Sequence, residues 1–135
     1  MRVFDAQTLN YVRILEDITG AKVKDCFVDE NGIVVFVIYP GDIGKAIGKS
    51  GNNIKMVMKI LNKKISIIEF NEDPKIFIKN CIKPINAEVT INDKEIIIKS
   101  RNIKEKGLLI GREKSRLKKL KTLAQKYYGL GLKIV

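Results

Sequence analysis

The chain has 135 residues, with 26 Lys or Arg against 15 Asp or Glu, and its formal net charge is +11. It contains no histidine, which excludes a Ser-His-Asp triad and removes the most common zinc ligand. Its length allows one ordinary domain or two small ones. The two cysteines, Cys26 and Cys81, fall in apolar segments, which is typical of buried reduced thiols in a cytoplasmic protein. We expect no cofactor, no metal and no enzymatic activity.

The positive charge is large for so small a chain and indicates a polyanionic partner, most often a nucleic acid. Lysines number 21 and arginines 5, a ratio that favours contact with phosphates over bidentate reading of base edges. The alternative is a solvated basic surface on a ribosomal or assembly protein. The longest apolar run, residues 33–39, is too short to cross a bilayer, so we expect no membrane partner.

The sequence contains an internal repeat. When it is shifted by 63 residues, Gly44–Lys49 aligns without a gap on Gly107–Arg112, and the apolar segments before these glycines also align. We therefore expect two copies of one structural unit, residues 1–71 and 72–135. Each copy is small for independent folding.

The first copy has clear boundaries between its elements. Asp5 can cap a first helix that Gly20 ends, and Asn31-Gly32 is a strong hairpin signal. The hydrophobic pattern predicts a helix over 6–18, strands over 22–28 and 33–38, helices over 42–47 and 52–61, and a strand over 65–70.

The second copy repeats this order. Pro74 suits a first helical turn, and Asn92-Asp93 separates two strands. The pattern predicts a helix over 74–82, strands over 87–91 and 95–100, helices over 103–110 and 115–128, and a strand over 131–135. The fold class is therefore α+β, with the order α-β-β-α-α-β in each copy.

The junction between the two later helices of the first copy reads Gly48-Lys49-Ser50-Gly51. Two glycines let the backbone turn tightly and approach a ligand, because no Cβ intervenes. The second glycine opens a helix whose free N–H groups attract an anion. The alternative is a helix–turn–helix corner that uses glycine only for close packing.

The same residues resemble the end of a nucleotide-binding P-loop. That motif requires a glycine at position 43, where this chain has Ile43, and Gly44 is one residue too close. No apolar strand ending in Asp is available to hold magnesium. We therefore do not favour a nucleotide-hydrolysing enzyme or a small-molecule substrate.

The unit order and the glycine loop resemble a type II KH domain, and two such units in tandem resemble the archaeal NusA-like transcription factors. The similar segments are residues 15–21, 25–30, 41–55 and 70–74. The resemblance implies a three-stranded sheet with helices on one face and binding of single-stranded RNA through the G-x-x-G loop. It also implies a role in transcription termination or antitermination with RNA polymerase. A ribosome-associated or ribosome-assembly KH protein would share every local feature.

On this reading, phosphates contact the loop of the first copy and bases rest on an aliphatic groove beside it. The residues expected at the loop are Gly48, Lys49, Ser50, Gly51, Asn52 and Lys55. The residues expected in the groove are Ile43, Ile47, Ile54 and Val57.

The second loop departs from the pattern, because the second glycine is replaced by Lys114 and Glu113 adds repulsion toward phosphate. The turn is expected to survive if Lys114 keeps ordinary helical geometry. Residues 71–135 nevertheless carry a net charge of +9 against +2 for residues 1–70. We favour RNA binding over a purely structural role. The expected contacts of this copy are Gly111, Arg112, Lys114, Arg116 and Lys118.

A basic amphipathic helix such as residues 112–126 can also lie on a membrane or meet an acidic partner. Its apolar stripe is narrow and the chain has no Trp, which argues against a membrane. The sequence does not define the oligomeric state, and a monomer is favoured.

Overall fold

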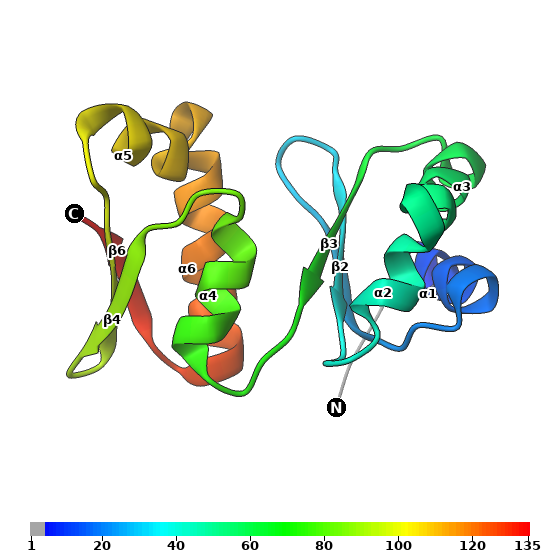
Figure 1. Cartoon of the computed structure of the whole chain (residues 1–135), viewed down its shortest axis with the longest axis horizontal. Coiled ribbons are helices and arrows are strands. Elements are labelled where there is room, and N and C mark those ends of the chain that lie inside the picture. The colour runs from blue at the N-terminus through cyan, green and yellow to red at the C-terminus, as the bar shows by residue number, and fades with distance from the viewer. Residues whose placement is uncertain (1–4) are drawn as a thin grey trace. The chain divides into compact units, whose positions relative to one another are not determined.

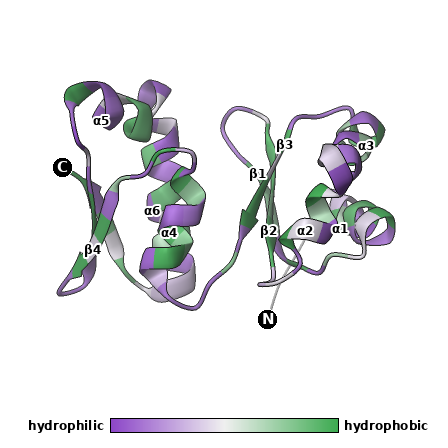
Figure 2. Ribbon diagram, viewed as in Figure 1, coloured by the Kyte–Doolittle hydropathy of each residue, from purple (hydrophilic) through white to green (hydrophobic). Residues whose placement is uncertain are grey.

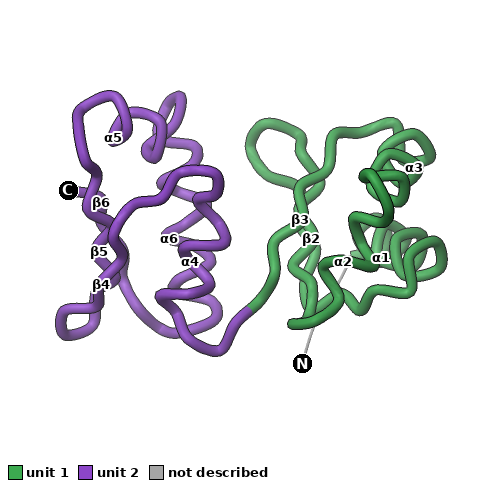
Figure 3. Tube along the Cα trace, viewed as in Figure 1, with its two compact units in different colours: residues 1–70 green, residues 71–135 purple. Residues whose placement is uncertain are grey.

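A computed structural model describes residues 5–135. The chain forms two compact units that divide between Phe70 and Asn71 (Figure 3). Each unit has its own three-stranded sheet and its own helices (Figure 1). The α+β class expected from the sequence is confirmed.

The first unit has the predicted order of elements, with boundaries that agree to within a residue. Its elements are α1 (Ala6–Thr19), β1 (Val23–Val28), β2 (Val34–Ile38), α2 (Ile43–Ile47), α3 (Asn52–Leu61) and β3 (Ile65–Glu69). Helix α1 begins where the side chain of Asp5 accepts a hydrogen bond from the backbone N–H of Thr8, at 2.7 Å. It ends at Gly20, whose φ of +75° suits a residue without a Cβ.

Strand β2 is the centre of the first sheet. It pairs antiparallel with β1 and parallel with β3. Val34, Phe36 and Ile38 of β2 pack in one buried cluster with Leu15 of α1 and Val57 of α3, so the helices cover one face of the sheet. Because β3 runs parallel to β2, the chain must cross over between them, and α2 and α3 form this crossover. The turn between the two helices is the predicted glycine loop.

The second unit repeats this topology. Its elements are α4 (Pro74–Ile82), β4 (Glu88–Asn92), β5 (Glu95–Lys99), α5 (Ile103–Ile110), α6 (Ser115–Tyr128) and β6 (Gly131–Ile134). Strand β5 is central, antiparallel to β4 and parallel to β6. Ile96 and Ile98 of β5 are fully buried, as are Leu109 of α5 and Leu120 of α6. Here too, the crossover consists of two helices joined by a short turn.

The helices carry both polar and apolar residues, while every residue of β2 is apolar (Figure 2). Within residues 5–135, none of the helices is long and apolar enough to span a bilayer. Both cysteines are free; Cys26 is buried and Cys81 is half-buried. Burial raises the pKa of each thiol to about 12. Both thiols are therefore protonated and weakly reactive near neutral pH.

Candidate nucleic-acid interface

The first loop joins α2 to α3 in a single tight turn. Gly48 ends α2, donating its N–H to the carbonyl of Gly44 at 2.9 Å. Its φ of +73° and ψ of 175° then redirect the chain. Ser50 and Gly51 follow at φ values of +55° and +74°, and the N–H of Gly51 returns to the carbonyl of Gly48 at 3.2 Å. This geometry leaves Lys49 and Ser50 exposed at the tip of the turn.

The second loop has the same backbone shape. Gly111 has a φ of +75° and a ψ of 170°, and Glu113 and Lys114 have φ values of +55° and +62°. The N–H of Lys114 donates to the carbonyl of Gly111 at 3.1 Å, which reproduces the bond that closes the first loop. Each residue of this turn lies 63 positions after its counterpart.

The turn therefore survives although Lys114 does not have the ordinary helical geometry on which its survival was expected to depend. Lys114 occupies the left-handed region, as its counterpart Gly51 does. The hydrogen bond to Gly111 and the start of α6 immediately afterwards hold the turn closed despite the added Cβ. A lysine in the left-handed region is strained, and backbone strain persists only where the surrounding structure determines the conformation.

A side chain from the following helix braces each loop. The side-chain amide nitrogen (Nδ2) of Asn53 donates a hydrogen bond to the backbone carbonyl of Lys45 in α2, at 2.8 Å. In the second unit, one terminal nitrogen of the Arg116 guanidinium lies 3.4 Å from the carbonyl oxygen of Leu108 in α5. The other lies 3.4 Å from the carbonyl oxygen of Ile82, the last residue of α4. Burial lowers the pKa of Arg116.

The RNA contact that the sequence predicts for Arg116 stays a prediction. In the structure this half-buried side chain lies beside two carbonyl groups of its own unit. Sequence reasoning missed Asn53. The available signal was the 63-residue shift, which aligns Asn53 with Arg116. The two side chains differ so much in charge and length that the alignment did not suggest a shared role.

The expected aliphatic groove is only partly available on the surface. Ile47 is 40% exposed, and Ile43 and Ile54 are half-buried. A Cβ built on Gly51 would lie 3.7 Å from a methyl group of Ile54, so this side chain borders the loop. Val57 is fully buried in the core cluster and cannot contact a base. That expectation is wrong because Val57 lies on the face of α3 that packs on the sheet.

The remaining expected contacts are polar or charged residues around the two turns. The exposed ones are Asn52, Lys55, Arg112 and Lys118, in addition to Lys49, Ser50 and Lys114. Gly48, Gly51 and Gly111 are half-buried. Between positions 99 and 126, 11 residues are basic and 2 are acidic, so the second loop lies in the most positive part of the chain.

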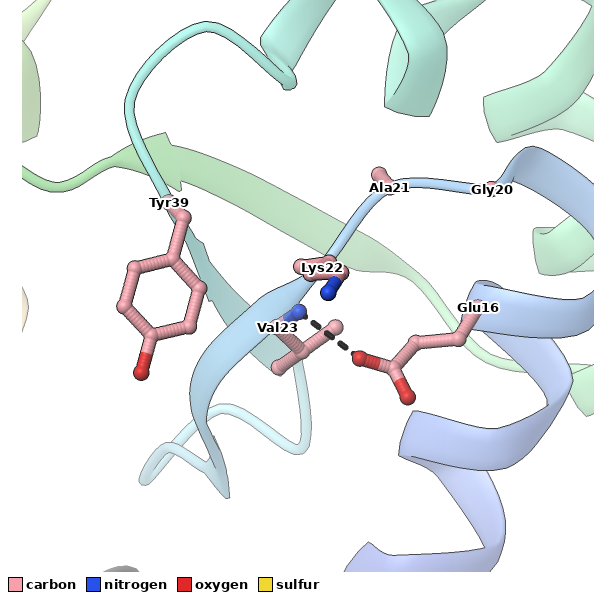
Figure 4. A pocket seen from close by; sticks show the side chains of 6 residues that line it. All are labelled: Glu16, Gly20, Ala21, Lys22, Val23 and Tyr39. Carbon is pink, nitrogen blue, oxygen red and sulfur yellow. Dashed lines mark hydrogen bonds between the residues drawn. The ribbon is translucent and has the colours of Figure 1, made fainter.

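A shallow hollow of about 390 Å³ lies elsewhere on the first unit (Figure 4). Its lining residues are Glu16, Gly20, Ala21, Lys22, Val23 and Tyr39. The carboxylate of Glu16 accepts the N–H of Val23 at 2.9 Å, so this group helps to join α1 to β1. Tyr39, the residue just after β2, is 39% exposed. No residue of either glycine loop lines this hollow.

The comparisons with known proteins agree with this geometry. The KH domain family model matches residues 13–88, from within α1 to the first residue of β4. The chain belongs to the KH domain family.

Archaeal relatives make the resemblance more specific. A Methanococcus vannielii protein named "Probable transcription termination protein NusA" is 44% identical over 89 residues, covering 65% of this chain and 51% of the relative. A Halococcus morrhuae protein of the same name is 28% identical over 134 residues, covering 96% of both chains. The chain therefore spans about half the length of the first relative and almost all of the second. The expected resemblance to archaeal NusA-like proteins is confirmed.

A solved structure agrees over nearly the whole length. The protein named in "Crystal structure of APE1850" is 27% identical, with a TM-score of 0.74. The match covers 98% of this chain and 99% of that one. The similarity therefore extends to the second unit, beyond the residues that the family model matches.

Proposed function

We propose that the chain binds single-stranded RNA through its two glycine loops. One observation carries this proposal: the exposed turns at 48–51 and 111–114 share left-handed backbone at equivalent positions, although only the first has two glycines. Left-handed conformations cost free energy in non-glycine residues, and strain of this kind clusters at functional sites. KH domains clamp about four nucleotides with such a loop.

In the first unit, the RNA backbone contacts the turn. The N–H groups of Gly48 and Gly51 already donate to carbonyls of α2 and of the turn. A phosphate at the turn therefore accepts a hydrogen bond from the Ser50 hydroxyl, while Lys49 supplies positive charge. The start of α3, a ten-residue helix, contributes its positive dipole end, with Asn52 and Lys55 beside it. A base then rests against Ile43, Ile47 and Ile54.

In the second unit, side-chain charge carries more of the binding. Lys114 takes the place of the second glycine, and Glu113 repels phosphate, so the backbone is less accessible. Arg112, Lys114 and Lys118 around Gly111 supply the attraction. We assign residues 1–71 to a first KH domain and 72–135 to a second whose glycine motif is degenerate. An RNA held at both loops gains from the high effective concentration of the second site.

The names of the archaeal relatives support transcription termination or antitermination as the setting of this binding. RNA polymerase is then the expected protein partner, and the chain acts as a monomeric, non-enzymatic RNA-binding factor in the cytoplasm. These names favour transcription over the ribosome-associated alternative. Copurification tests this assignment: recovery of the chain with RNA polymerase would support it, and recovery with ribosomal subunits instead would contradict it.

Reversing the charge at the loop tests RNA binding. The double variant Lys49→Asp/Ser50→Asp should lose at least tenfold in affinity for single-stranded RNA, because two carboxylates then face the phosphates. The matched control is Asn62→Asp/Lys63→Asp, which makes the same charge change at exposed positions beyond the other end of α3. The control should bind within twofold of wild type. If the loop variant also binds within twofold, or if both double variants lose the same affinity, the loop proposal fails.

A further inference from the structure

We propose that Asn53 and Arg116 are the positioning residues of the two RNA-binding loops, holding each turn in its binding shape before RNA arrives. This inference rests on the proposed function, and it assigns Arg116 an internal role in place of direct RNA contact. The two residues lie 63 positions apart, as do Lys45 and Leu108, whose carbonyls they reach. One side chain of the following helix therefore holds each loop, and we call it the brace of that loop. The brace is Asn53 in the first unit and Arg116 in the second, two chemically different side chains.

The brace occupies the space behind the first glycine of each loop. A Cβ on Gly48 would lie 2.6 Å from Cγ of Asn53, and a Cβ on Gly111 would lie 2.8 Å from Cβ of Arg116. Real Cβ atoms essentially never approach other atoms so closely. Glycine is thus needed here because the bracing residue packs directly against the backbone. The closest contact that a Cβ on Gly51 would make is an ordinary one of 3.7 Å, so this requirement applies to the first glycine alone.

The brace also satisfies carbonyl groups that the helices leave without partners. The last four carbonyls of a helix have no partner within it, and Lys45 and Leu108 lie in the last turns of α2 and α5. Arg116 additionally places a positive charge at the C-terminal end of α4, beside Ile82, where the helix dipole favours a cation. Each bracing side chain therefore ties the helix after the loop to the helix before it.

A fixed angle between these helices matters for binding because the turn itself is strained. Without a brace, residues such as Ser50 and Glu113 can relax from positive φ to the ordinary helical region. The loop would then have to be ordered again when RNA binds, and this ordering weakens affinity. Replacing a positioning residue should therefore change affinity without changing how many phosphates the protein neutralises.

Salt dependence separates positioning from direct contact. For a single strand, the slope of log K against log salt changes by about 0.7 for each phosphate that the protein ceases to neutralise. Asn53→Ala should bind RNA about tenfold more weakly, which matches the removal of one hydrogen bond of typical strength, with an unchanged slope. Arg116→Gln should likewise weaken binding with an unchanged slope. The comparison variant Arg112→Gln removes an exposed charge and should reduce the slope.

Two further variants keep the result interpretable. Asn53→Arg installs the second unit's brace in the first unit and should recover most of the affinity that Asn53→Ala forfeits. Ile60→Ala, a truncation at an exposed position of α3, should change nothing. Amide hydrogen exchange at residues 48–51 in RNA-free protein should be faster in Asn53→Ala than in wild type.

The outcomes are distinct. The positioning role is overturned if Asn53→Ala folds and shows wild-type RNA affinity and wild-type amide exchange at residues 48–51. It is also overturned if the slope of log K against log salt is reduced in Arg116→Gln. If Asn53→Ala and Lys49→Asp/Ser50→Asp both bind as tightly as wild type, the proposed function itself fails. If Lys49→Asp/Ser50→Asp loses binding while Asn53→Ala binds as tightly as wild type, the proposed function stands and only the inference about the brace fails.

Discussion

Lys114 adopts the backbone conformation that Gly51 adopts in the first loop, with a φ of +62° against +74°. The residues before them, Glu113 and Ser50, also match at +55° each. The second loop therefore holds two consecutive non-glycine residues in the left-handed region, where each L-residue with a Cβ costs about 1–2 kcal/mol. The first loop holds only one.

Restoring the missing glycine should stabilise the second unit. Lys114→Gly relieves the strain at this position and should raise the free energy of unfolding by about 1 kcal/mol, since glycine tolerates positive φ. The same change removes a cation from the RNA-binding loop and should weaken RNA binding. Urea titration and RNA titration of one protein sample measure both effects. A variant less stable than wild type would show that the left-handed lysine is not strained.

The first glycine of each loop should not tolerate a methyl group. Gly48→Ala forces a Cβ into the Asn53 side chain and places alanine at a φ of +73°, so it should lower the free energy of unfolding by more than about 1 kcal/mol. Gly44→Ala is the matched control, because this glycine lies within α2 and a Cβ there meets nothing within 4 Å. The control should be neutral or slightly stabilising, since alanine favours helix. Equal stability of the two variants contradicts the packing described here.

Stability in acid should depend on Glu105. Its carboxylate accepts the backbone N–H of Arg101 at 3.0 Å and lies 2.7 Å from the Arg101 guanidinium, which holds its pKa below the usual value of about 4.5. A folded carboxyl with a lowered pKa stabilises the protein fully above its unfolded pKa. This stabilisation is lost as pH falls through the folded pKa.

Wild type should therefore lose more stability on acidification than Glu105→Gln does. The measurement is the free energy of unfolding in urea, from neutral pH to well below 4.5. Glu88→Gln, at an exposed position of β4, controls for removal of any one carboxylate. Parallel pH profiles for wild type and Glu105→Gln would show that the ion pair contributes nothing.

The elements of both units could be predicted because their signals were local. Asp5 and Gly20 mark the ends of α1, Asn31-Gly32 marks the hairpin, and Pro74 marks the start of α4. Each signal acts within a few residues, through a cap, a turn or a fixed φ, so a single sequence contains it.

The contacts of the Arg116 side chain could not be read in this way. Arg116 lies on a helix with many basic residues, and only the folded unit shows that its guanidinium lies beside two carbonyl groups. The burial of Val57, by contrast, follows from helical spacing, because Val57 shares a face of α3 with Leu61. The left-handed turn at Glu113 and Lys114 lacked the glycine or asparagine that usually marks such a conformation. Only the repeat, which matches these residues with Ser50 and Gly51, indicated the turn.

The most direct test follows the backbone amides while RNA is added. Isotope-labelled protein is titrated with a mixed-sequence single-stranded oligoribonucleotide, and amide chemical shifts are recorded at each step. RNA binding through both loops predicts that the largest changes fall on residues 48–51 and 111–114 and diminish as salt is raised. Binding accompanied by changes confined to other surfaces, such as the hollow beside Tyr39, would contradict it.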